Sequence, residues 1–177
     1  TILKLPASTY TGLPASLEVC DSSSVINLIP INPSGVFSGN SGISGSTFDP
    51  SLAGVGTHTL TYSVDTLIGT LQCNSSSSFN ITVNPLPTVG FIAIPNDTVC
   101  IGASVTLCGT GAVSYVWTGG ITDCVAFIPP LGTSTYTVTG TDANGCTNTA
   151  VATITVLSLP VVTASASPAS ICIGDCA

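Results

Sequence analysis

The sequence repeats itself with a period of roughly 75 residues, which points to tandem copies of one small structural unit. The segment NITVNPLP at 80–87 reappears as TITVLSLP at 153–160. Likewise, GTHTLT at 56–61 reappears as GTSTYT at 132–137. The segments at 80–87 and 153–160 both end in Leu-Pro, as expected where one unit meets the next.

The cysteines follow the same period. Cys73 matches Cys146, and Cys100 matches Cys172 within the related segments TVCIG and ICIG. Leu-Pro pairs at 86–87 and 159–160 mark the joints, and proline biases the residue before it towards extended geometry. We therefore expect three parts: a first repeat over 1–85, a second over 86–159, and the truncated start of a third over 160–177.

Each unit is expected to be a β-sandwich. Polar and apolar residues alternate over 57–64, 104–107 and 135–139, which is typical of half-buried strands. The sequence Asp142-Ala143-Asn144-Gly145 suits a hairpin turn, because Asn-Gly tolerates positive φ. The sequence thus predicts an all-β fold of tandem antiparallel β-sandwiches, and the short Pro-containing linkers predict a semi-rigid rod.

Composition narrows the possible partners. The chain has 177 residues with one basic residue, Lys4, and a net charge of −7. Without a basic patch it is not expected to bind nucleic acid. The mean hydropathy is +0.63, but no apolar run approaches the ~20 residues of a membrane helix. We expect no membrane insertion.

The eight cysteines are expected to form disulfides, which implies an oxidising, extracellular compartment. Each full repeat has an early and a late cysteine, which predicts the bridges Cys20–Cys73 and Cys100–Cys146. The second repeat has an additional pair, which predicts Cys108–Cys124. The partners of Cys172 and Cys176 stay open: they bond to each other or elsewhere in the third unit.

The second repeat resembles a known family. Its segments VCIGASVTL at 99–107, SYVWTGG at 114–120 and TSTYTVTGTDANGCT at 133–147 are similar to the immunoglobulin-like and PKD-like repeats of large Bacteroidota surface proteins. The first repeat is a looser relative. The resemblance implies tandem immunoglobulin-like sandwiches in a long cell-surface adhesin or filament protein of the type IX secretion cargo type.

Core positions follow from the sandwich pattern. Trp117 is expected in the core beside a disulfide, as on the third strand of immunoglobulin domains. Tyr136 and Leu60 are expected at equivalent inward positions, and Phe48 and Phe127 as equivalent core residues before them.

No catalytic constellation is apparent, so we do not expect an enzyme or a cofactor. The one possible base, His58, lies in a Thr-rich strand and aligns with Ser134, so we expect it on a solvated strand face. We expect no metal site. Asp97, Asp142 and Asn144 are weak calcium candidates, and local turn hydrogen bonds are the alternative role for them.

Glycosylation is a further expectation. Thr66 and Thr98 lie in Asp-Thr-apolar triplets that resemble the Bacteroidota O-glycosylation motif. Asn74, Asn80 and Asn96 lie in Asn-x-Ser/Thr triplets that fit the N-glycosylation acceptor. Such a glycoprotein would be extracellular and located at the cell surface.

The expected function is a structural stalk or filament segment of an extracellular adhesin. Its partners would be neighbouring repeats, and low charge would permit self-association into fibres. The alternatives are a glycan- or protein-binding module, for which the Gly/Ser-rich stretch at 35–46 is the candidate, and an accessory module of a secreted hydrolase.

Overall fold

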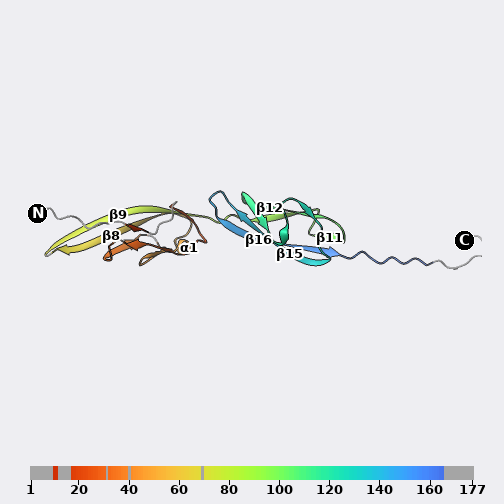
Figure 1. The fold of residues 1–177 in the computed structure, drawn as a ribbon, viewed down its shortest axis with the longest axis horizontal. Coiled ribbons are helices and arrows are strands. Elements are labelled where there is room, and N and C mark those ends of the chain that lie inside the picture. The colour runs from red at the N-terminus through yellow and green to blue at the C-terminus, as the bar shows by residue number, and fades with distance from the viewer. Residues whose placement is uncertain (1–9, 12–16, 31, 40, 69, 166–177) are drawn as a thin grey trace, which may run out of the picture.

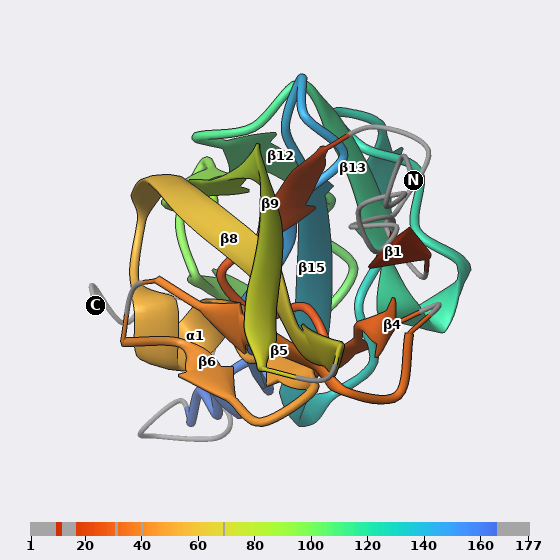
Figure 2. The same ribbon diagram turned by 90° about the vertical axis from the view of Figure 1, so that its left-hand side faces the viewer.

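Two lobes lie end to end in the computed structural model, which describes residues 10–11, 17–30, 32–39, 41–68 and 70–165 (Figure 1). Seen along the long axis, the C-terminal lobe lies behind the N-terminal lobe (Figure 2). The secondary structure is almost entirely β, with one short α-helix and one short 3-10 helix. The fold is therefore all-β, and the two lobes make an elongated molecule.

The N-terminal lobe contains β1 (Tyr10–Thr11), β2 (Glu18–Cys20), β3 (Ile26–Asn27), β4 (Ile29–Pro30), β5 (Gly35–Ser38), β6 (Ile43–Ser44), β7 (Thr47–Phe48), α1 (Pro50–Ala53), β8 (Gly56–Ile68) and β9 (Leu71–Asn84). The C-terminal lobe contains β10 (Gly90–Ile94), β11 (Thr98–Cys100), β12 (Val105–Thr110), β13 (Ser114–Trp117), η1 (Thr118–Gly120), β14 (Ala126–Phe127), β15 (Gly132–Thr141) and β16 (Thr147–Leu157).

Each lobe has a four-stranded and a three-stranded sheet. The four-stranded sheets have the orders β2-β9-β8-β5 and β11-β16-β15-β13, and the three-stranded sheets have the orders β3-β7-β6 and β10-β12-β14. The N-terminal lobe also has the β1–β4 pair. The expectation of purely antiparallel sheets is wrong at two places, because β2 runs parallel to β9 and β11 runs parallel to β16. Parallel neighbours need a long crossover, and the rest of each lobe supplies it.

Alternation along β8 builds the core of the N-terminal lobe. His58, Leu60, Tyr62 and Val64 point to one face and are buried. The threonines between them point outward, where hydroxyl and amide groups pair across to β9. Thr57 Oγ1 lies 3.2 Å from Thr82 Oγ1, Thr59 Oγ1 donates to Asn80 Oδ1 at 2.9 Å, and Thr61 Oγ1 lies 2.9 Å from Ser78 Oγ. We call these three pairs the hydroxyl ladder.

The C-terminal lobe has its own core, in which both sheets take part. Val105 and Leu107 of β12 pack with Trp117, Val138 and Ile154 of the four-stranded sheet. The indole Nε1 of buried Trp117 donates a 2.8 Å hydrogen bond to Asp123 Oδ1, which also accepts the Gly109 amide. Apolar side chains between two facing sheets make this lobe a β-sandwich.

The expected core residues all contact the cores. Leu60, Phe48 and Trp117 are buried, while Tyr136 and Phe127 are partly buried and pack against the second core. The rings of Phe127 and Tyr136 meet edge to face, with centroids 5.2 Å apart.

The expectation of a solvated His58 is wrong. Its side chain is 6% exposed, and Nε2 lies 2.7 Å from the Gly54 carbonyl oxygen, which satisfies the ring nitrogen inside the lobe. The strand period explains this placement, because His58 shares its face with Leu60 and Tyr62. Tyr62 is likewise fully buried, and its hydroxyl donates to the Asn32 carbonyl at 2.9 Å.

Candidate functional site: a disulfide across the joint

The early and late cysteines lie at opposite ends of each lobe. Cys20 is in register with Asn84, the last residue of β9, whereas Cys73 lies on β9 eleven positions earlier. A strand rises ~3.3 Å per residue, so these two positions are about 36 Å apart. Cys100 is in register with Leu157, also eleven positions after Cys146. Disulfides need Cα atoms about 4.4–6.8 Å apart, so neither pair can bond within its lobe.

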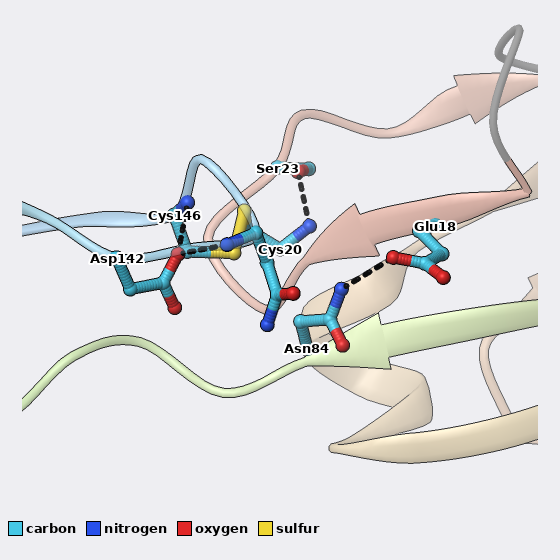
Figure 3. Close-up of a disulfide and its surroundings, with 7 residues drawn as sticks. Glu18, Cys20, Ser23, Asn84, Asp142 and Cys146 are labelled. Atoms are coloured by element: carbon cyan, nitrogen blue, oxygen red, sulfur yellow. Dashed lines mark hydrogen bonds between the residues drawn. A yellow bond between two sulfur atoms is a disulfide. The ribbon is translucent and has the colours of Figure 1, made fainter. Parts of the chain in front are cut away.

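The structure instead joins Cys20 to Cys146, with their Cα atoms 5.5 Å apart and a sequence separation of 126. The predicted bridges Cys20–Cys73 and Cys100–Cys146 are therefore wrong. Cys20 belongs to the N-terminal lobe and Cys146 to the C-terminal lobe, so this disulfide crosses the joint between them (Figure 3). Cys146 is fully buried and Cys20 is partly buried.

A hairpin turn holds Cys146 in place. Asp142 Oδ1 accepts hydrogen bonds from the backbone amides of Asn144 at 2.9 Å and Cys146 at 2.8 Å. The Asp142 amide donates back to the Cys146 carbonyl at 2.9 Å, and Gly145 adopts a φ of 81° that favours glycine. Asp142 thus acts as the turn residue that orients the cysteine (Figure 3).

A second turn holds Cys20. The Ser23 amide donates to the Cys20 carbonyl at 2.9 Å, and the Cys20 amide donates to Ser23 Oγ at 3.0 Å. The Asp21 amide donates to the Asn84 carbonyl at 3.0 Å, and Asn84 Nδ2 donates to Glu18 Oε2 at 3.4 Å. These bonds tie the cysteine to the end of β9, where the chain leaves the lobe.

The linker runs beside the disulfide. It spans residues 85–89 between β9 and β10 and contains Pro85 and Pro87, of which Pro87 is buried. The Pro87 carbonyl accepts a 3.0 Å hydrogen bond from Asn148 Nδ2, two residues beyond Cys146. The lobes are therefore joined twice, by the backbone and by the disulfide. A joint with two covalent connections resists bending and twisting more than a single linker does.

The other described cysteines differ in state. The predicted pair Cys108 and Cys124 forms a disulfide within the C-terminal lobe. Cys73 and Cys100 are free thiols, and Cys100 is exposed while Cys73 is partly buried. Cys172 and Cys176 lie outside the described residues.

We predict that Cys100 reacts with a thiol reagent faster than Cys73, because Cys100 is exposed and Cys73 is partly buried. Timed alkylation of the native protein, followed by peptide mass mapping, measures both rates. The four bonded cysteines provide an internal control that should remain unlabelled. Faster labelling at Cys73 would contradict the described placement.

The remaining candidate residues are spread over the surface. Thr98, Asn74, Asn80 and Asn96 are exposed, while Thr66 is partly buried on β8. Asp97 is exposed and accepts from the Thr98 hydroxyl through Oδ1. Among the described residues, no group of three or more His, Cys, Asp or Glu side chains is placed to hold a metal ion.

A polar surface hollow of about 370 Å³ lies between β8 and β9, lined by Ser63, Asp65, Asn74, Ser75 and Ser76. Its lining has one carboxylate, that of Asp65, and otherwise hydroxyl and amide groups. In the part of the chain that the structure describes, no helix has the length and apolarity needed to cross a membrane.

Sequence reasoning located the joint at Leu86-Pro87 but missed the disulfide across it and the residues that support it, namely Glu18, Asn84 and Asn148. The cysteine spacing alone carried no signal for this bond, because the distance between Cys20 and Cys73 follows from the pairing of β2 with the end of β9.

No protein-family model matches the chain, and comparison with curated proteins returned no match.

Proposed function

We propose that this chain is a stalk or filament segment of an extracellular cell-surface adhesin, built from tandem immunoglobulin-like β-sandwiches. Its role is mechanical rather than catalytic: it holds another part of the assembly at a distance. The observation that carries the proposal is the Cys20–Cys146 disulfide, which connects two end-to-end lobes across their joint.

The joint supports this role through its effect on shape. A rod keeps its ends apart only when its joints resist bending, and here a five-residue linker with two prolines is reinforced by a disulfide. In the chain-entropy model, closing a loop of this length stabilises the folded molecule by about 5 kcal/mol. A disulfide of this kind persists in an oxidising compartment, in agreement with an extracellular location.

The aromatic side chains favour a stalk over a glycan-binding module. Trp117 and Tyr62 are buried in the two cores, and the Tyr115 hydroxyl donates to the Ala112 carbonyl at 2.7 Å. Glycan platforms use exposed aromatic faces, whereas these rings pack within the lobes. The exposed surface of β8 and β9 is instead occupied by the hydroxyl ladder.

Small-angle X-ray scattering tests the proposal. At ~3.3 Å per residue, β9 and β16 together predict a particle of at least about 80 Å in length. The double variant Cys20→Ser, Cys146→Ser should keep both lobes folded but give a broader distribution of interatomic distances, because only the linker remains. The matched control Cys108→Ser, Cys124→Ser removes a disulfide within one lobe and should leave the distribution unchanged. A compact particle with the joint disulfide intact would refute the stalk.

A further inference from the structure

Cys100 occupies the same structural position as Cys20. Each cysteine ends the strand that runs parallel to the last strand of its lobe. The amide of the next residue donates to the end of that last strand in both lobes: Asp21 to Asn84 at 3.0 Å, and Ile101 to Leu157 at 2.9 Å. The turn after each cysteine also closes in the same way, from Ser23 to Cys20 at 2.9 Å and from Ala103 to Cys100 at 3.1 Å.

The two positions differ in what lies next to them. Cys20 is bonded to the hairpin cysteine of the following lobe, while Cys100 is an exposed thiol. Figure 1 shows β11, which ends at Cys100, towards the far end of the C-terminal lobe, where the chain leaves β16. The same turn therefore presents a cysteine outward at the end of each lobe.

The segment after β16 has the same Leu-Pro sequence as the linker between the lobes, but its side chains are exposed. Leu86 and Pro87 are partly and fully buried at the joint, whereas the matching Leu159 is 63% exposed and Pro160 is exposed. The neighbouring Val161 is 91% exposed. A further lobe placed as the C-terminal lobe is placed on the N-terminal lobe would cover this apolar segment.

We propose that Cys100 is the covalent attachment site for a following repeat, and that its partner is the cysteine at the hairpin position of Cys146 in that repeat. The proposal rests on the tandem repeats of the proposed function. It adds the disulfide connectivity between them: the early cysteine of each repeat bonds to the late cysteine of the next repeat. Cys73, a late cysteine near the tip of the β8–β9 hairpin, is by the same register the acceptor for a preceding repeat.

The chemistry is thiol–disulfide exchange with a disulfide oxidant, such as oxidised glutathione or a protein disulfide. The Cys100 thiolate attacks one oxidant sulfur, forms a mixed disulfide and releases one oxidant thiol. The partner thiolate then attacks the Cys100 sulfur and releases the second oxidant thiol. Two protein thiols and one oxidant disulfide thus become one protein disulfide and two oxidant thiols.

The test uses the full chain with a second copy of residues 87–159 inserted after Leu159, which recreates a Leu-Pro joint. Thr147→Ser in the inserted copy distinguishes its cysteine peptide from the original. After oxidation with a glutathione redox buffer, peptides are mapped by mass without reduction. We expect Cys100 bonded to the inserted copy's Cys146, and a fall of about tenfold in the alkylated fraction of Cys100.

An internal reference and two further variants control this experiment. The Cys20–Cys146 and Cys108–Cys124 peptides in the same digest identify correctly folded molecules, and the register is read only in these. Repeating the experiment with Cys172→Ser and Cys176→Ser removes competing thiols. The control Cys100→Ser should leave the inserted copy's Cys146 free.

The outcomes separate the two proposals. Cys100 that remains alkylatable while the Cys20–Cys146 disulfide is intact overturns the proposed pairing and leaves the rod of two lobes untouched. A compact particle in scattering refutes the stalk even if the bond to the inserted copy forms.

Discussion

Pulled from its two ends, the oxidised protein should lengthen far less than the same protein without the joint disulfide. Tension that enters at the N-terminus reaches Cys20, crosses to Cys146 through the disulfide, and continues to the C-terminus. The residues between the two cysteines form a covalent loop outside this path. They include most of the N-terminal lobe and the strands β10 to β15.

The expected difference is large and can be measured by single-molecule force spectroscopy. The separation of 126 residues corresponds to about 440 Å of extended chain at ~3.5 Å per residue. The double variant Cys20→Ser, Cys146→Ser should release most of this length in added unfolding steps. The reduced wild-type protein should do the same.

The second disulfide provides the control. Cys108 and Cys124 both lie inside the loop, so Cys108→Ser, Cys124→Ser should leave the extension of the oxidised protein unchanged. Full extension of the oxidised wild-type protein would show that Cys20 and Cys146 are not bonded.

Replacing Trp117 by alanine should unfold the C-terminal lobe at a much lower temperature. The substitution empties the largest space in its core and leaves Asp123 without the indole donor. Tryptophan-to-alanine changes in a core cost about 3–5 kcal/mol, which for a lobe of this size lowers the midpoint by more than about 10 °C. Hydrogen exchange resolved along the chain measures this loss on β15 and β16.

Neighbouring residues supply two references for the Trp117 variant. Val116 lies next to it on β13 and is 72% exposed, so Val116→Ala should change the stability by less than about 0.5 kcal/mol. The amides of β8 and β9 report on the N-terminal lobe, which has a separate core and should keep its protection. Equal loss of protection in both lobes would mean that they unfold as one unit.

Much of the fold could be predicted from local pattern. The alternation of polar and apolar residues over 57–64 and 135–139 located parts of the long strands β8 and β15, because a half-buried strand exposes every second side chain. The same alternation, applied strictly, would have placed His58 beside Leu60 in the core. We instead predicted a solvated His58 because the side chain is polar and aligns with Ser134. In the structure the Gly54 carbonyl oxygen satisfies the ring nitrogen inside the lobe.

The disulfide register could not be predicted in the same way. The repeat identifies equivalent cysteines, but equivalence does not say whether Cys20 bonds within its unit or to the next one. That choice depends on the parallel pairing of β2 with the end of β9, which hydropathy does not encode. It depends also on the orientation of the second lobe, which the buried Pro87 and its bond to Asn148 help to fix.

The hydroxyl ladder makes the cross-strand stabilisation of β8 and β9 independent of charge screening by salt. Ion pairs between surface strands weaken as dissolved ions screen them, with a Debye length of about 3 Å at 1 M salt. The pairs Thr57–Thr82, Thr59–Asn80 and Thr61–Ser78 carry no net charge, so this screening does not act on them. A strand surface stabilised by neutral hydrogen bonds therefore keeps the same cross-strand interactions at low and at high salt concentration.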